Sequence, residues 1–112
     1  MKSFISIIMI LCSISFVNAQ NKKVKTETIK VWGNCGMCKT SIENAADLKG
    51  VKAAEWDKTS KLLTVSYDTT KISSDQIQLK IAAIGYDTEK HRASDKAYEE
   101  LHGCCKYERK KE

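Results

Sequence analysis

Two pairs of closely spaced cysteines are the residues of this chain best suited to chemistry. Cys35 and Cys38, the first pair, are three residues apart, and Cys104 and Cys105, the second pair, are adjacent near the C-terminus. A disulfide within either pair would close a very small loop and would restrict the unfolded chain little. Neighbouring Cα atoms are also only about 3.8 Å apart, closer than the roughly 4.4–6.8 Å that a disulfide spans. Both pairs therefore indicate thiol chemistry rather than a scaffold, with a bridge between the pairs as the alternative.

The first pair has the residue types and the position of a site for a soft metal ion. It follows an alternating polar and apolar segment, 26–32, that predicts a strand, and it opens a helix predicted to run from Gly36 or Met37 to Leu48. A helix N-terminus carries partial positive charge and unpaired N–H groups, which lower the pKa of a nearby thiol. Two thiolates without His, Asp or Glu beside them suit Cu(I), with Zn(II) and Hg(II) as alternatives. Such an open site can release its ion by ligand exchange.

The second pair lies in a C-terminal segment, residues 92–112, that offers further candidate ligands. A short helix is predicted over 95–101, so the second pair would stand in the turn after it. One hypothesis folds this turn back, so that Cys104 or Cys105 becomes a third or fourth sulfur ligand beside the first pair, with His102 as a further candidate. The alternative is a tail whose cysteines bind metal independently or bridge to another chain.

Six predicted elements would position the first pair. In order they are strand 26–32, helix 36–48, strand 51–56 with a bulge, strand 62–67, a helix that a Ser73–Gln76 capping box opens and Gly85 ends, and strand 86–91. This order predicts an α+β fold, a ferredoxin-like βαββαβ sandwich. An antiparallel four-stranded sheet would carry two helices on one face, followed by a short C-terminal helical tail.

The N-terminal segment predicts export. Lys2 precedes an uncharged, mostly apolar run from Phe4 to Val17, and compact residues follow up to Ala19, as at a signal-peptide cleavage site. The apolar run is shorter than the roughly 20 residues that a membrane span needs, so cleavage is favoured over an uncleaved anchor. We therefore predict a periplasmic or extracellular protein, cleaved near Ala19-Gln20. The predicted divisions are a signal peptide at 1–19, a polar leader at 20–25, a metal-binding domain at 26–91 and a cysteine-containing tail at 92–112.

Composition excludes several classes of function. A chain of 112 residues has room for one small domain. Its net charge of +5 is mostly scattered, which does not indicate nucleic-acid binding. No phosphate loop or paired-carboxylate site is recognisable, so we expect a binding protein rather than an enzyme. The alternatives are a thiol–disulfide redox protein, because a CxxC pair at a helix start is also redox geometry, and an interaction module that cysteine oxidation switches. The chain is short for a thioredoxin-like fold and contains no Pro.

Residues 26–90 resemble the heavy-metal-associated domain family, which includes copper chaperones, metal-binding modules of copper-pumping ATPases and the periplasmic mercuric-ion-binding protein. The resemblance implies the ferredoxin-like fold, metal held by Cys35 and Cys38, and Tyr86 near the metal loop. It also implies transfer to a partner, such as a metal-transporting ATPase or another membrane transporter. The matching segments, in order, are Cys35-x-x-Cys38, Ile42-Glu43, Gly50-Val51, Val65-Ser66-Tyr67-Asp68 and Ile84-Gly85-Tyr86-Asp87.

The sequence also departs from the family pattern around the first pair. The family usually has Met two residues before the first Cys, where this chain has Gly33, and Met37 stands between the cysteines instead. Trp32 replaces a usual Gly, and its side chain is a candidate to supply the bulk that the family's Met provides. We expect Met37 and Lys39 to lie around the metal. Lys39 is a candidate to offset the negative charge of a bis-thiolate site, and the alternative, which is commoner for such a Lys, is a solvated helix face. A monomer is expected, and a metal-bridged dimer is the alternative.

Overall fold

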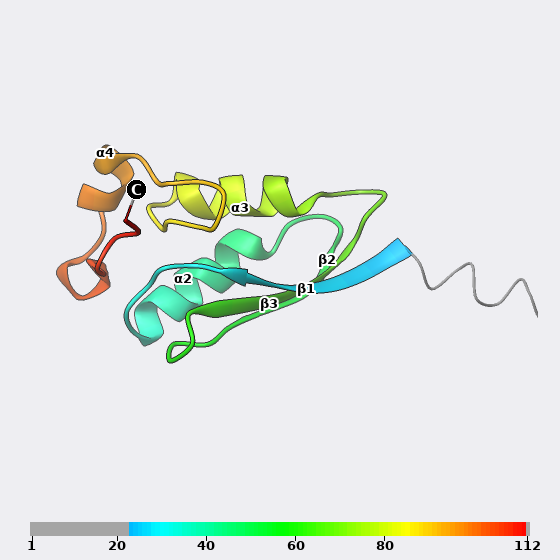
Figure 1. Ribbon diagram of the computed structural model, residues 1–112, viewed down its shortest axis with the longest axis horizontal. Coiled ribbons are helices and arrows are strands. Elements are labelled where there is room, and N and C mark those ends of the chain that lie inside the picture. Colours follow the sequence, from blue (N-terminus) through cyan, green and yellow to red (C-terminus); the bar gives the residue numbers. More distant parts are fainter. Residues whose placement is uncertain (1–22, 112) are drawn as a thin grey trace, which may run out of the picture.

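The computed structural model describes residues 23–111 (Figure 1). The predicted signal peptide and the leader up to residue 22 lie outside the described residues. Within residues 23–111, no helix is long and apolar enough to cross a membrane.

An antiparallel sheet forms the base of the domain. Over the described residues it has three strands, β1 (Val24–Lys30), β2 (Val51–Trp56) and β3 (Leu62–Asp68), in the order β1-β3-β2. Strand side chains alternate between two faces, and the buried face of β3 carries Leu63, Val65 and Tyr67. The register of β2 shifts between Val51 and Ala53, which confirms the predicted bulge.

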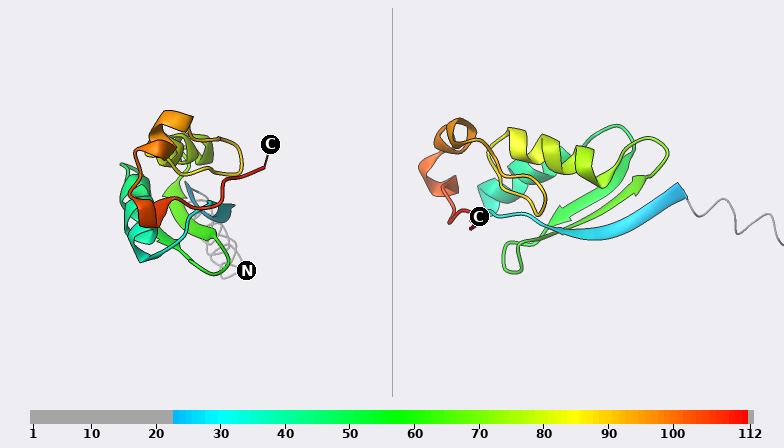
Figure 2. Two further views of the ribbon diagram at one scale, coloured as in Figure 1. Left: turned by 90° about the vertical axis from the view of Figure 1, so that its left-hand side faces the viewer. Right: turned by 45° about the horizontal axis from the view of Figure 1, so that its top comes forward.

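Two helices cover the buried face of the sheet. They are α2 (Gly36–Ala46) and α3 (Ser74–Ala83), and they lie side by side in both views of the molecule (Figures 1 and 2). The predicted capping box opens α3, because the Ser73 hydroxyl accepts from the Gln76 N–H while the Gln76 side chain accepts from the Ser73 N–H. Ile42 of α2 and Ile77 and Ile81 of α3 are fully buried against the sheet. The buried apolar side chains of both helices therefore face the core.

The predicted fourth strand is replaced by a single bridge. Within the described chain, residues 86–91 contribute only the isolated antiparallel bridge of Val31 with Thr88. The chain turns back directly after it, because the Thr88 N–H donates to the His91 carbonyl at 2.7 Å. The Lys90 N–H then donates to the Gln78 side chain of α3. On the β1 side, the Lys30 N–H donates to the Glu89 side chain, and the Thr88–His91 turn takes the His91 carbonyl. The ladder therefore stops, and the predicted four-stranded sheet is corrected to three strands and a bridge.

The C-terminal segment packs over one end of the sandwich. It contains α4 (Asp95–Glu99) and a 3₁₀ turn, η3 (Gly103–Cys105), and it lies at the end where β1 leads into α2 (Figures 1 and 2). Gly85 permits this close approach: its φ is +112°, and a Cβ there would stand 2.8 Å from the Ala97 carbonyl oxygen. The tail is therefore built against the end of α3 rather than extending away from the domain.

Candidate metal centre

The loop between β1 and α2 presents the first pair. Cys35 is the N-cap residue of α2, and Cys38 lies in the first helical turn. The backbone N–H groups at the start of α2, that of Cys38 first and that of Met37 next, lower the pKa of the Cys35 thiol to about 7. The Cys35 and Cys38 sulfurs are 3.8 Å apart. The start of α2 therefore supplies one thiol that is about half ionised near pH 7, with a second thiol beside it.

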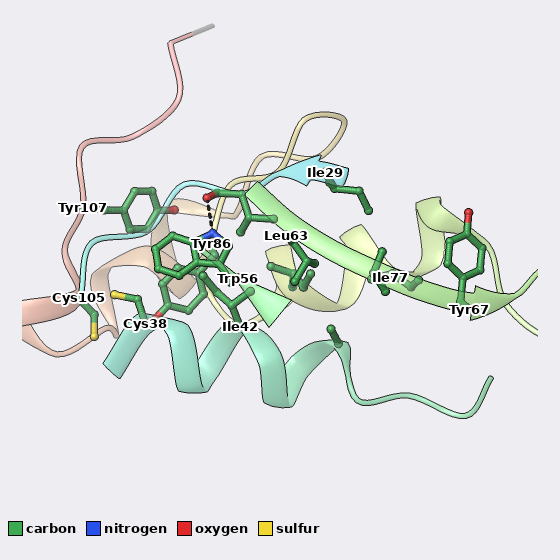
Figure 3. Close-up of a cluster of buried hydrophobic side chains, with 14 residues drawn as sticks. Ile29, Cys38, Ile42, Trp56, Leu63, Tyr67, Ile77, Tyr86, Cys105 and Tyr107 are labelled. Atoms are coloured by element: carbon green, nitrogen blue, oxygen red, sulfur yellow. Dashed lines mark hydrogen bonds between the residues drawn. The ribbon is translucent and has the colours of Figure 1, made fainter. Parts of the chain in front are cut away.

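A bulky aromatic ring fills the space beneath this loop. A Cβ on Gly33 would stand 2.8 Å from the Trp56 ring and 3.2 Å from Ile42. The Trp56 indole N–H donates to the Val31 carbonyl at 2.9 Å, which fixes the ring under the loop (Figure 3). The bulk that the sequence assigned to Trp32 thus comes from Trp56 of β2, and Gly33 leaves room for it. Trp32 is half-buried, with the Lys30 and Lys110 ammonium nitrogens each 5.7 Å from its ring centroid.

A third sulfur reaches the first pair from the tail. The sulfurs of Cys35, Cys38 and Cys105 all lie within 4.8 Å of one another, and the cysteines are free thiols. Figure 3 shows Cys38 and Cys105 approaching each other from α2 and from the tail. Three sulfurs that each lie about 2.3 Å from one ion in a plane are separated by about 4.0 Å. The observed triangle is therefore of the size that a single metal ion can occupy.

The new member of the triangle is buried. Cys105 is 2% exposed and Cys38 is fully buried, whereas Cys35 is half-buried. Burial, followed by a hydrogen bond with Cys38, raises the pKa of the Cys105 thiol to about 12. Tyr86 is buried beside them, and burial together with the Cys38 and Cys105 sulfurs raises the pKa of its hydroxyl. In the metal-free protein Cys105 and Tyr86 are therefore neutral near pH 7.

A buried hydroxyl anchors the tail that carries Cys105. Tyr107 is 3% exposed, and its hydroxyl donates to the Gly85 carbonyl at 2.7 Å while accepting from the Asp87 N–H at 2.8 Å. Its ring stacks on that of Tyr86, with the ring centroids 5.7 Å apart. Cys105 is two residues from this anchor, so its sulfur is held against the end of α2.

A buried ion pair completes the anchor. The Arg109 guanidinium binds both carboxylate oxygens of Asp87, at 2.8 and 3.1 Å, and Asp87 is fully buried. The Ala93 and Lys110 N–H groups also donate to this carboxylate. Burial alone would raise the pKa of Asp87, but Arg109 and the two N–H groups hold it below its usual value. We call Asp87, Tyr107 and Arg109 the tail clamp.

The other cysteine of the second pair lies outside the triangle. Cys104 is exposed, and its sulfur is 3.8 Å from the Cys105 sulfur and 3.7 Å from the thioether sulfur of Met37. Its carbonyl accepts from the Asn34 side-chain amide at 3.2 Å and from the Cys35 thiol at 3.5 Å. Met37 is 50% exposed. Cys104 and Met37 thus flank the three-thiol triangle on its solvent side.

Two other candidates have different surroundings from those expected. The Lys39 ammonium donates to Glu43 at 2.6 Å and to the Trp56 carbonyl at 2.9 Å, which draws it toward β2. Lys39 therefore serves the α2–β2 contact instead of offsetting thiolate charge. His102 is exposed at the N-cap of η3, and its carbonyl accepts from the Cys105 N–H. Among the described residues, the clustered ligand atoms are those of Cys35, Cys38 and Cys105, so His102 stands apart from them.

Sequence reasoning missed part of this centre. It gave Asp87 and Arg109 no role of their own. An arginine two residues after Tyr107, together with an acidic residue in an otherwise buried segment, was the available signal. Such residues are seldom buried unless they are paired, so their pairing could have been proposed but not placed.

Comparisons with known proteins show that the chain is similar to metal-handling proteins. No model of a known protein family matches the chain. A zinc-transporting ATPase from Synechocystis sp. is 38% identical over 77 residues, which are 67% of this chain but 11% of the ATPase. A copper chaperone CopZ from Staphylococcus haemolyticus is 34% identical over 68 residues, which are 60% of this chain and 94% of the chaperone. A solved CopZ metallochaperone structure aligns at 32% identity with a TM-score of 0.55, covering 57% of this chain and 98% of that one.

Proposed function

Because the chain belongs to the heavy-metal-associated domain family, we propose that it binds Cu(I) between Cys35, Cys38 and Cys105 and carries it outside the cytoplasm. The observation that carries this proposal is the triangle of three thiol sulfurs within 4.8 Å of one another. The proposed activity is binding and transfer, without a catalysed reaction.

The protonation states suggest an order of loading. Cys35 is the most exposed of the three and has a pKa of about 7, so its thiolate is available to an arriving ion. The buried Cys38 and Cys105 then complete the site, and Cys105 releases a proton as its sulfur binds. Release runs in reverse, because a partner's thiolate can replace the accessible Cys35 sulfur first. Exchange of one sulfur at a time avoids a free ion.

Three sulfurs favour a soft ion. Thiolates suit both Cu(I) and Zn(II), but Zn(II) in structural sites almost always has four protein ligands in a tetrahedron. The triangle offers three sulfur ligands, and His102 lies apart from it. Zn(II) and Hg(II) remain the competing ions in the proposal, since one relative is named for zinc transport.

Location and partner belong to the same proposal. The N-terminal segment supports export with cleavage near Ala19-Gln20. We expect a metal-transporting ATPase or another membrane transporter to exchange the ion with this protein. Outside the cytoplasm the thiols must be kept reduced for metal to bind. N-terminal sequencing of the protein purified from whole cells tests the cleavage: a start at Gln20 supports cleavage and export, and a start at Met1 contradicts cleavage.

A titration tests the binding site. The reduced protein is titrated with Cu(I), Zn(II) and Hg(II) against competing chelators, beside Cys35→Ser/Cys38→Ser. We expect the double variant to lose Cu(I) affinity by about 10,000-fold, or about 5.6 kcal/mol. Cys105→Ser should lose about tenfold to a hundredfold, because two sulfurs remain. Cys104→Ser is the matched control and should retain the first Cu(I) ion at full affinity. Unchanged Cu(I) affinity in the double variant would refute the site.

A thiol–disulfide redox protein is the second candidate, and one observation favours it. Cys35 has a lowered pKa, and its sulfur is 3.8 Å from that of Cys38, as in a redox pair. Reduction of a disulfide substrate by the metal-free protein distinguishes the two functions. Turnover that Cys35→Ser abolishes, together with weak Cu(I) binding, would support the redox protein.

A further inference from the structure

The structure places two more sulfurs directly outside the three-thiol triangle. We propose that the Cys104 thiol and the Met37 thioether form a second, outer site for Cu(I), which shares the Cys105 sulfur with the inner site. This inference rests on the proposed function, because the outer ion lies beside the inner one.

The sulfur positions fit a second ion. The Cys104 sulfur is 3.7 Å from the Met37 sulfur and 3.8 Å from the Cys105 sulfur. Two sulfurs 3.7 Å apart, each about 2.3 Å from an ion, subtend an angle of about 107° there. That angle lies within the range of trigonal and tetrahedral sites. The Cys105 sulfur can bridge two ions, because a thiolate has more than one lone pair.

The backbone holds Cys104 in this position before metal arrives. Its carbonyl accepts from the Asn34 side chain and from the Cys35 thiol, which ties the tail to the metal loop. The tail clamp holds the chain on the other side, through Tyr107 two residues after Cys105. Preorganised ligands bind an ion with a smaller loss of conformational entropy. The tail therefore holds the Cys104 thiol beside the Met37 thioether of α2 before an ion arrives.

Exposure distinguishes the two sites. Cys38 is fully buried and Cys105 is 2% exposed, whereas Met37 is 50% exposed and Cys104 is also exposed. An ion that arrives from solvent or from a partner therefore meets the outer sulfurs first. The ion can then move inward while it stays bound to the Cys105 sulfur, as the sulfurs of Cys35 and Cys38 replace those of Cys104 and Met37. We infer that the outer site is the entrance to the inner one.

The ligand types predict which ions the outer site accepts. A thioether is a soft, uncharged ligand that suits Cu(I), whereas Zn(II) is held by thiolates, imidazoles and carboxylates. The outer pair supplies one thiol and one thioether. The second site should therefore fill with Cu(I) and not with Zn(II).

Native mass spectrometry of the reduced full-length protein tests the second site. With Cu(I) supplied in excess, the wild type should bind two ions, and Met37→Leu and Cys104→Ser should each bind one. Leu79→Ala is the matched control, because Leu79 is an exposed apolar side chain on the other helix, at 47% exposure, and it should bind two. Zn(II) should give one ion for the wild type and for Met37→Leu alike. The signal of the Met37 methyl group, labelled with ¹³C, should shift only as the second Cu(I) binds.

The outcomes separate this inference from the proposed function. One Cu(I) in the wild type, or two in both Met37→Leu and Cys104→Ser, would overturn the outer site and leave the inner one standing. A Met37 methyl signal that does not move would also overturn it. If Cys35→Ser/Cys38→Ser instead bound Cu(I) as the wild type does, the inner site would fail first.

Discussion

The two regions that build the metal centre are held in place by different physical means. The first pair is local: Cys35 and Cys38 are three residues apart, and the start of α2 positions both. Cys105 is distant in the sequence, and the tail clamp positions it through buried polar contacts. A local site forms whenever its helix forms, whereas a distant ligand depends on every contact that docks its segment. The sulfurs of Cys35 and Cys38 are therefore positioned by the domain itself, whereas the Cys105 sulfur leaves the centre if the tail undocks.

The largest expected effect comes from breaking the ion pair of the tail clamp. Arg109→Leu leaves the buried Asp87 carboxylate without its guanidinium, which should destabilise tail docking by about 3–5 kcal/mol. Cu(I) affinity should then fall to that of Cys105→Ser, while the first pair still binds. Thermal unfolding and Cu(I) competition measure both effects.

A surface pair on the same tail provides the control for Arg109→Leu. Lys106 pairs with Glu99 at 2.9 Å where both side chains are open to solvent. Lys106→Ala should change stability by less than about 1 kcal/mol and leave Cu(I) affinity unchanged. If the two variants behaved alike, the tail clamp would not be what places Cys105.

A smaller effect is expected from the Tyr107 hydroxyl. Tyr107→Phe keeps the ring on Tyr86 but leaves the Gly85 carbonyl and the Asp87 N–H without their buried partner. The free energy of unfolding should fall by about 1–3 kcal/mol. Hydrogen exchange at the Asp87 amide should accelerate, and the amides of the β1–β3 ladder should stay protected. Equal acceleration in both places would show that the tail and the sheet open as one unit.

The smallest expected effect is a loss of folding stability at acidic pH. The pKa of Asp87 is lower in the folded protein than in the unfolded chain, where it is about 3.9. Ionised Asp87 therefore contributes its full stabilisation at pH values above the unfolded pKa, and this stabilisation is lost as the pH falls through the folded pKa. Stability should therefore fall below about pH 4 by at most about 1.4 kcal/mol per pH unit for this group. Thermal unfolding of the wild type and of Asp87→Asn between pH 6 and pH 2.5 checks this. The difference between them should shrink as the acid is strengthened, and a constant difference would contradict it.

Much of the fold follows from local patterns. Strand 51–56, its bulge and the Ser73–Gln76 capping box are where the sequence predicts them, because alternation and capping act within a few residues. The fourth strand was wrong because the Lys30 N–H of β1 pairs with the Glu89 side chain and the Thr88–His91 turn takes the His91 carbonyl. Those partners come from other elements or from a turn that propensity does not reveal.

The candidate site divides in the same way. The position of Cys35 and Cys38 at a helix start could be read from their spacing, and their role as ligands stays a prediction. Whether Cys104 or Cys105 faces inward could not be read, because adjacent residues point in different directions. Burial of Tyr107 decides it, since that ring fixes the rotation of the chain two residues after Cys105.

The contact between Trp32 and Lys110 gives the molecule an internal optical reporter. The Lys110 ammonium lies 5.7 Å from the Trp32 ring centroid and also donates to the Thr88 carbonyl. It therefore stays over the indole only while the C-terminal tail is docked on the domain. Trp56 is sealed in the interior and provides a constant background. Changes in intrinsic tryptophan fluorescence should therefore report undocking and redocking of the tail in real time, without a dye.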